Sequence, residues 1–477
     1  MHLYNIILAE FGQKGQSMWH ELLTGTAVTV GGEILILLAF LHMLSTRRSP
    51  GSMIAWSLAI FLLPWIAVPL YFLFGHRKLF KRYQKLAFRL EPAGIEKPLC
   101  DHPVERLLFA NGIPPATPGN AFTLYDRPDT AYDAFCEHLQ RAEHAVDICV
   151  YQLILDDATR PLLEALARRA REGVRVRLLM DSIGSAGLYL FPKRLDFLKE
   201  AGVRIAWFMP FLHLPTRNFI NLRNHRKIYL FDDRVLLTGG MNLSGDYLTP
   251  DADSAGYTDI LCRIEGGAVH FHRQIFEADW AFATGTRHTA PSRVEIDERG
   301  EGCLQVAPSG PDTPNDGVIE ALLSAICTAR RRILIVTPYF IPNEEFMRAL
   351  AVAIHHGAKL TVVVPERSDH LISDLGRGSY LRELHAKGAR ILLHRGPVLH
   401  AKAMLFDDLG VVGTVNFDNR SLFYNFEVVN FLYSGEEVAR LEAWSREICR
   451  QTRPYLPTDR LFQTRLENFM RMMAPLV

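Results

Sequence analysis

The strongest constraint on the fold is an internal duplication that begins near Phe122. Each half repeats one order of segments: a helical pattern, an apolar run, a second helical pattern that ends at a glycine, and another apolar run. When the halves are laid over each other, Ile148 aligns with Ile333 and Gly202 with Gly388. This order predicts an α/β fold of two similar lobes related by an approximate two-fold axis, with mostly parallel sheet and a hairpin at each lobe's end. The expected helices cover Tyr132–His144, Arg160–Glu172, Gly317–Ala329 and Glu344–His356.

The chain of 477 residues is longer than one hydrophobic core usually supports. Stretches rich in proline and glycine mark connections at residues 91–118 and 285–316. We therefore predict a membrane anchor with two transmembrane helices (1–76), a basic interfacial segment and linker (77–118), a first lobe (119–290), and a second lobe with a C-terminal helix (291–477).

The predicted anchor rests on two apolar stretches. Ile54–Gly75 carries no charge and, as one helix, would cover the roughly 30 Å of a bilayer core. A buried core helix is the alternative, but Pro64 and Pro69 would be costly in a soluble helix. The earlier stretch, Leu22–Thr46, is a weaker span because it contains Glu33.

Charges around these stretches predict their orientation. The link between the spans contains Arg47 and Arg48, whereas more cations follow the second span: Arg77, Lys78, Lys81, Arg82, Lys85 and Arg89. The positive-inside rule then places the large C-terminal part in the cytoplasm. Lys78–Leu90 mixes basic and apolar residues at helical spacing, which is typical of a helix on an anionic membrane surface or of a solvated linker helix.

Composition excludes some classes of protein. Lys and Arg total 53 against 52 Asp and Glu, and this balance argues against a protein that coats nucleic acid. The seven cysteines contain no C-x-x-C spacing, so we expect reduced thiols and neither a structural zinc site nor a disulfide framework.

One chemical motif occurs once in each half. The first copy, NHRKIYLFDDRVLLTGGMN, contains His225, Lys227, Asp232 and, after two glycines, Asn242. The second copy begins LHAKAMLFDDLGVVGTVN and contains His400, Lys402, Asp407 and Asn416. Residues two apart on a strand point to the same face, so each histidine and its lysine present their side chains together.

These residue types suit the binding of a phosphate and reaction at it. Lysine supplies a point charge, asparagine donates a hydrogen bond, and histidine can act as nucleophile or as acid and base. A metal site is a weaker interpretation, because each lysine would repel a cation. One copy alone would be a weak signal, but two copies at equivalent places are strong. The two aspartates have either a chemical role or a structural one that ties the motif strand into its lobe.

The paired motif resembles that of the phospholipase D superfamily, and further segments resemble the bacterial cardiolipin synthases of that type. These segments are GTVNFDNRSLFYNFE (413–427), TPYFIP (337–342), SGP (309–311), NHRKI (224–228) and the N-terminal pair of apolar stretches. The resemblance implies phospholipase D-like lobes in a multi-pass protein of the bacterial inner (cytoplasmic) membrane.

The resemblance also implies a metal-independent transfer in two steps through a phosphohistidine, with no cofactor. His225 is then the nucleophile, His400 the acid and base, and each is oriented by a carboxylate further along its half, Asp259 and Glu427 respectively. Lys227, Lys402, Asn242 and Asn416 would hold the phosphate. Two phosphatidylglycerol molecules, among anionic membrane lipids, would give cardiolipin and glycerol.

Other functions remain compatible with these residues. A phospholipase D-type hydrolase would use water and release phosphatidic acid, and a related phosphatidyltransferase would use another acceptor. A nuclease is disfavoured by the apolar stretches and the near-neutral charge, and an inactive scaffold by the intact motifs. The sequence leaves the oligomeric state open.

Overall fold

The structure is a computed structural model that describes residues 29–45, 50–74, 89–92, 94–212, 221–286, 298–457 and 461–473. The chain divides into two compact units, Met1–Arg77 with Phe219–Asn221, and Lys78–Asn218 with Leu222–Val477. Most of the basic segment predicted at the membrane surface lies outside the described residues. The predicted boundary between the lobes, at residues 290 and 291, also lies outside them.

The first unit contains three described helical segments: residues 29–44, α2 (Pro50–Leu62) and α3 (Pro64–Phe74). Their buried side chains form a small core of Ala39, Met43, Ile60, Ala67, Val68 and Tyr71. One polar contact lies beside this core, because His42 Nδ1 is 2.9 Å from the Tyr71 hydroxyl.

The second predicted span is divided in the structure. Leu63 separates α2 from α3, because the following Pro64 disfavours helical geometry at the residue before it. The Leu63 N–H still donates to the Ala59 carbonyl at 2.9 Å. Within the described residues, no single helix has both the length and the apolar character needed to cross a membrane.

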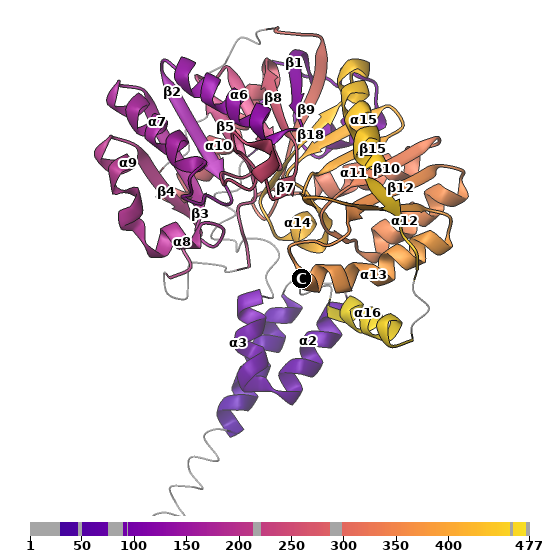
Figure 1. The fold of residues 1–477 in the computed structure, drawn as a ribbon. Helices are drawn as coiled ribbons and strands as arrows, with labels where there is room; N and C mark the ends of the chain where they lie inside the picture. The colour runs from indigo at the N-terminus through magenta and orange to yellow at the C-terminus, as the bar shows by residue number, and fades with distance from the viewer. Residues whose placement is uncertain are drawn as a thin grey trace, which may run out of the picture. The chain divides into compact units, whose positions relative to one another are not determined.

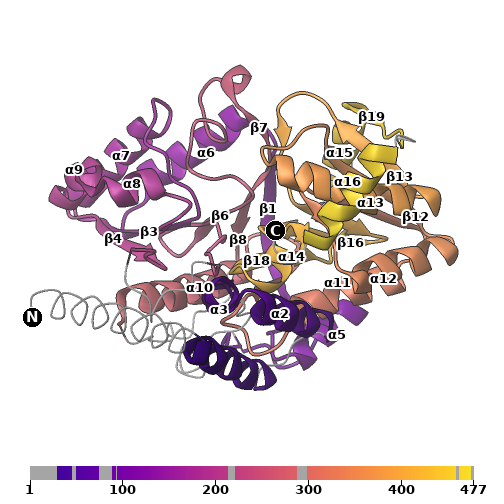
Figure 2. The same cartoon turned by 90° about the horizontal axis from the view of Figure 1, so that it is seen from below.

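The second unit is built on one sheet of 15 strands that runs through both lobes (Figure 1). Its order is β19-β13-β12-β10-β15-β16-β18-β9-β1-β8-β6-β5-β2-β3-β4. Strands β9 and β1 meet antiparallel where the lobes join, and Figure 2 shows a lobe on each side of β1. From this junction outward, seven strands follow one another in the same order in each lobe, which is the expected pseudo-two-fold arrangement, and β19 adds an eighth strand at the outer edge of the second lobe.

The first lobe follows α5 (Pro103–Ala110). Its elements are β1 (Thr117–Tyr125), α6 (Pro128–Arg141), β2 (Ala145–Val150), α7 (Thr159–Arg171), β3 (Arg175–Asp181), α8 (Ala186–Leu190), η1 (Pro192–Leu195), α9 (Asp196–Glu200), β4 (Arg204–Phe208), β5 (Ile228–Phe231), β6 (Val235–Gly239), η2 (Ala252–Ser254), β7 (Tyr257–Thr258), β8 (Leu261–Glu265) and α10 (Gly267–Thr284).

The second lobe repeats this order. Its elements are β9 (Gly302–Ser309), α11 (Gly317–Thr328), β10 (Arg332–Val336), β11 (Phe340–Ile341), α12 (Glu344–His355), β12 (Lys359–Pro365), α13 (Leu371–Ala386), β13 (Arg390–His394), β14 (Val398–Leu399), β15 (Ala403–Phe406), β16 (Leu409–Gly413), β17 (Phe417–Asp418), α14 (Asn419–Phe423), β18 (Glu427–Leu432), α15 (Gly435–Arg450), β19 (Thr452–Pro454) and α16 (Leu461–Met473).

Two details of the predicted fold are wrong. Within the 15-stranded sheet, parallel pairing is limited to β2-β3-β4 and β10-β12-β13, because each motif hairpin (β5-β6 and β15-β16) inserts antiparallel strands into the middle of its lobe. The pairing also makes Ile148 equivalent to Ile335 and not to Ile333: Val146 pairs with Phe231 as Ile333 pairs with Phe406. The alignment of the two halves was therefore off by two residues. A shift of two residues along a strand leaves the apolar side chains on the same face of the sheet, so the apolar pattern alone cannot reveal it.

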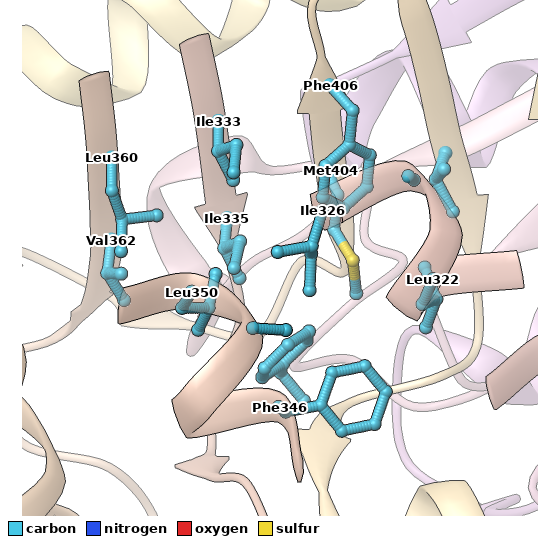
Figure 3. Close-up of a cluster of buried hydrophobic side chains, with 14 of the residues drawn as sticks. Leu322, Ile326, Ile333, Ile335, Phe346, Leu350, Leu360, Val362, Met404 and Phe406 are labelled. Atoms are coloured by element: carbon cyan, nitrogen blue, oxygen red, sulfur yellow. The ribbon is translucent and has the colours of Figure 1, made fainter. Parts of the chain in front are cut away.

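The four helices predicted from periodicity are confirmed as α6, α7, α11 and α12. In the second lobe, α11 and α12 bury apolar side chains against β10, β12 and β15 (Figure 3). Leu322 and Ile326 of α11 and Leu350 of α12 belong to this cluster. A core of this kind holds the strands in a fixed register, and the strands in turn position the motif residues.

Candidate active site

The motif histidines and lysines lie on the segments that lead into the two hairpins. His225 and Lys227 precede β5, and His400 and Lys402 precede β15. Because β5 is antiparallel to β2 and β15 to β10, all four residues lie at the sheet edge where the parallel strands end. None of these residues exposes more than 8% of its surface.

Each histidine is paired with a carboxylate from the other lobe. His225 Nδ1 is 3.0 Å from Glu427 Oε2, and His400 Nδ1 is 2.7 Å from Asp259 Oδ2. The two carboxylates expected to orient the histidines are therefore in place, but their partners are exchanged relative to the expectation that each lies in its own half. Because a carboxylate accepts, Nδ1 carries the proton in each ring, and Nε2 is left as the nitrogen that can react.

Backbone pairing between the lobes explains the exchange. The His225 N–H donates to the Phe426 carbonyl at 2.9 Å, one residue before Glu427. The His400 N–H donates to the Thr258 carbonyl at 2.8 Å, one residue before Asp259, as part of the β7-β14 pairing. Each lobe thus delivers a carboxylate beside the other lobe's histidine.

The motif glycines make room for this crossing. A Cβ on Gly240 would lie 2.1 Å from Asp259 Oδ1, and one on Gly413 would lie 2.3 Å from the Val428 carbonyl. Real Cβ atoms do not approach other atoms this closely, so both positions require glycine.

The motif aspartates lie at the hairpin turns, with φ of 53° at Asp232 and 51° at Asp407. The Asp232 carboxylate accepts hydrogen bonds of 2.7–2.8 Å from three successive backbone N–H groups, residues 143–145. Asp407 does the same at 2.7–2.9 Å for residues 330–332. These contacts support the structural one of the two expected roles, in which each aspartate ties its motif strand into its lobe.

Asp407→Ala is expected to lower the free energy of unfolding by about 2 kcal/mol, because several charge-assisted hydrogen bonds are lost together. The turnover of the folded enzyme should stay within about twofold of wild type, since no contact with histidine or lysine is removed. Thermal unfolding and specific activity measure the two effects. Asp408→Ala is the control, because Asp408 is exposed and its ion pair with Arg331 lies at the surface. A large loss of turnover at unchanged stability would restore the catalytic assignment.

Burial lowers the pKa of both motif lysines below the usual value for a lysine. Burial and the charge of Lys402 lower the pKa of Lys227 to about 7, and burial lowers the pKa of Lys402 to about 8 against the charge of Asp259. Lys402 Nζ lies 3.0 Å from His400 Nε2, and Lys227 Nζ donates to the His225 carbonyl at 2.9 Å. Burial disfavours the charged form of both lysines, so an anion placed between them would be stabilised, and a phosphodiester is such an anion.

The pKa values of both motif histidines are lowered, which favours the neutral form of each imidazole. Burial lowers the pKa of His225 although Glu427 opposes it. Burial and Lys402 lower the pKa of His400 to about 4 although Asp259 opposes it. A bound phosphate anion would offset the lysine charges and raise both pKa values, so binding prepares one imidazole to act as an acid.

The predicted phosphate-binding asparagines are also buried at this edge. Asn242 Oδ1 accepts from the Gln152 N–H at 3.3 Å. Among the described residues, Asn416 Oδ1 has no hydrogen-bond partner. A buried amide oxygen without a hydrogen-bond partner lowers the stability of the fold. A bound ligand could use this side chain, because the amide oxygen accepts hydrogen bonds and the amide NH2 group donates them.

Two groups of site residues were not predicted. Tyrosine rings lie around the histidines. The ring centroid of Tyr151 is 5.1 Å from that of His225. The ring centroids of Tyr247, Tyr257 and Tyr339 are 5.2, 5.4 and 6.4 Å from that of His400. The only sequence signal was their position beside the motifs, as in TPYFIP.

Arg226, between His225 and Lys227, points away from the site and clamps the lobes together. It bonds to Asp279 at 2.6 Å, to Asp312 at 3.0 Å and to the Glu427 carbonyl at 3.0 Å. A fully buried arginine is stable only with such partners, so this clamp fixes the backbone that carries Glu427.

The chain is similar to known proteins over most of its length. A family model described as "Cardiolipin synthase, PLD-like domain" matches residues 135–280 and 322–449, and "Phospholipase_D-nuclease N-terminal" matches residues 34–76. Cardiolipin synthase 1 of Bacillus anthracis is 30% identical over 466 residues, covering 90% of each chain. A cardiolipin synthase of Geobacillus thermodenitrificans is 31% identical over 466 residues, covering 93% of this chain and 92% of its own.

The crystal structure of a phosphatidylserine synthase from Haemophilus influenzae superposes with a TM-score of 0.57. It covers 79% of this chain and 99% of its own at 14% identity, which supports the fold alone. The duplicated fold, the two motif copies brought to one buried site, and relatives matched over nine-tenths of the chain agree. The chain therefore belongs to the bacterial cardiolipin synthase family of the phospholipase D superfamily.

Proposed function

We propose that this phosphatidyltransferase transfers a phosphatidyl group from one phosphatidylglycerol to another, giving cardiolipin and glycerol. The observation that carries the proposal is the pair of crossed histidine–carboxylate contacts with two buried lysines between the lobes. It supplies two imidazoles that can react through Nε2, one as nucleophile and one, once phosphate binding favours its protonated form, as acid, around a site that favours a phosphodiester.

In the first step His225 Nε2 attacks the phosphorus atom of the donor lipid. The bond from phosphorus to the glycerol oxygen breaks, and that oxygen takes a proton from His400 Nε2. Glu427 holds His225 in the reactive tautomer and stabilises the positive charge that the ring acquires. Lys227, Lys402 and the two asparagines stabilise the crowded phosphoryl oxygens.

In the second step the acceptor hydroxyl gives its proton to His400 Nε2, and its oxygen forms the new bond to phosphorus. The phosphorus–nitrogen bond to His225 breaks, and the electron pair returns to the ring. Asp259 orients His400 in both steps. The lysines and asparagines, with no metal, provide the charge stabilisation in this scheme.

The placement of exposed apolar residues supports a lipid substrate. Leu190 and Phe191, after β3, are 49% and 60% exposed, and Leu371 and Ile372, after β12, are 73% and 53% exposed. Because β3 and β12 run parallel to β2 and β10, these residues lie at the sheet edge that holds the histidines, one pair in each lobe. In Figure 1, α8 and α13 both lie at the lower edge of the lobes.

We also propose that residues 1–76 anchor the chain in the bacterial inner membrane by two spans, with the catalytic lobes in the cytoplasm. The match of residues 34–76 to a phospholipase D N-terminal model and the cations that follow Gly75 support this topology. Protease treatment of intact spheroplasts tests it, and cleavage of the lobes from outside would reject it.

The activity is tested with the full chain in mixed micelles that contain phosphatidylglycerol as the only phospholipid, with and without a chelator. We expect cardiolipin and glycerol in equal amounts under both conditions. Phosphatidic acid without cardiolipin would make the enzyme a hydrolase, and loss of activity with the chelator would reject the metal-independent scheme.

A further inference from the structure

The two histidines have different surroundings despite the pseudo-symmetry. Tyr247 and Tyr257 stack on each other with ring centroids 4.4 Å apart and planes 3° apart, and both make T-shaped contacts with the His400 ring. Tyr339 adds a third edge contact. The side of the site beside His400 is therefore walled by aromatic rings.

The equivalent positions around His225 hold no tyrosine. The strand register makes Gln152 equivalent to Tyr339, and spacing from the motif residues makes Ser421 equivalent to Tyr247 and Asn425 to Tyr257. His225 has one tyrosine neighbour, Tyr151, whereas three tyrosine rings lie around His400. The aromatic wall therefore lies beside the histidine that exchanges protons with the alcohol groups.

One carboxylate joins two of these rings. Asp369, between β12 and α13, accepts a hydrogen bond from the Tyr339 hydroxyl at 2.6 Å and from the Tyr257 hydroxyl at 3.3 Å. Its side chain is 27% exposed. Each carboxylate oxygen has a further lone pair, so Asp369 can still accept from a hydroxyl that enters beside His400.

We propose that Asp369, Tyr257 and Tyr339 form an alcohol subsite beside His400, which binds the vicinal hydroxyls of a glycerol headgroup. The inference rests on the proposed function, in which His400 takes the proton of the acceptor hydroxyl. In that step the neighbouring hydroxyl donates to Asp369 while the rings cover the carbon chain and exclude water. Water or a simple alcohol lacks the second hydroxyl, so the subsite selects glycerol acceptors.

Competition for the intermediate tests the subsite. The full-length enzyme turns over phosphatidylglycerol micelles in the presence of ethanol, and the ratio of cardiolipin to phosphatidylethanol is measured by mass spectrometry. This ratio reports how the intermediate is partitioned and is independent of the amount of folded enzyme. Asp369→Asn is expected to lower it about tenfold, because one charged acceptor for the second hydroxyl is lost.

The control is Asp253→Asn on η2, which should keep the wild-type ratio. If Asp369→Asn gives no product, the same ratio is measured for Tyr339→Phe and Tyr257→Phe. Each of these variants keeps its aromatic ring and removes one hydroxyl that donates to Asp369, so a lowered ratio is expected in both. If the active variants keep the wild-type ratio of cardiolipin to phosphatidylethanol, the proposed subsite is wrong, although the proposed synthesis of cardiolipin is not affected. Absence of cardiolipin with the wild-type enzyme would instead reject the proposed function itself.

Discussion

His225→Ala is expected to lower cardiolipin formation by about 10⁴-fold or more, because it removes the atom that forms the covalent bond to phosphorus. His400→Ala should cost a similar factor with phosphatidylglycerol, whose glycerol leaving group requires a proton. Activity is measured in the micelle assay at equal concentrations of folded protein. His355→Ala, an exposed histidine at the end of α12, should have no effect.

The two variants should differ in what accumulates. His400→Ala retains the nucleophile and, with a phosphodiester that releases p-nitrophenolate, should form the intermediate but release it slowly. Digestion without acid followed by mass spectrometry should then locate the phosphatidyl group on His225. If the His225→Ala variant instead carries the phosphatidyl group on His400, then His400 is the nucleophile and His225 the acid and base.

Local patterns predicted much of this molecule. Helical periodicity located α6, α7, α11 and α12 to within a few residues, because each buries one face against its own lobe. The motif spacing also predicted that each histidine and its lysine lie together, since side chains two apart on an extended segment share a face, and Lys402 Nζ lies 3.0 Å from His400 Nε2. These features depend only on neighbours in the sequence.

Features that depend on distant segments were not predicted. The antiparallel strands in the middle of each lobe follow from where the motif hairpins insert, which the alternation of helix and strand does not encode. The clamp of Arg226 on Asp279 and Asp312 joins residues from both lobes. No local pattern distinguishes this buried arginine from the exposed ones.

The exchange of carboxylates has a similar origin and a larger functional consequence. In sequence, Asp259 follows His225 and Glu427 follows His400, so proximity favours pairing within each lobe. The backbone bonds of His225 to Phe426 and of His400 to Thr258 cross the junction instead. The contacts between the lobes depend on how the two lobe surfaces pack together. The carboxylate that pairs with each histidine can therefore be identified only once both lobes are assembled.

Glu427→Gln and Asp259→Asn are each expected to lower cardiolipin formation by roughly 10³–10⁴-fold, because an amide no longer fixes the imidazole tautomer or stabilises its charge. The crossed pairing makes their defects different in kind. Glu427 acts on the nucleophile at 3.0 Å, whereas Asp259 acts on the acid and base at 2.7 Å. An exposed carboxylate, in Glu436→Gln, serves as the control.

A donor that releases p-nitrophenolate separates the two defects, because this leaving group departs without a proton. With it, Asp259→Asn should regain most of the wild-type rate of the first step, as His400→Ala does. Glu427→Gln should remain slow, since the nucleophile is still misoriented. Pairing within each lobe predicts the reverse: Asp259→Asn would stay slow and Glu427→Gln would recover. The burst of p-nitrophenolate therefore tells which carboxylate serves which histidine, and with it whether the active site exists only where the two lobes meet.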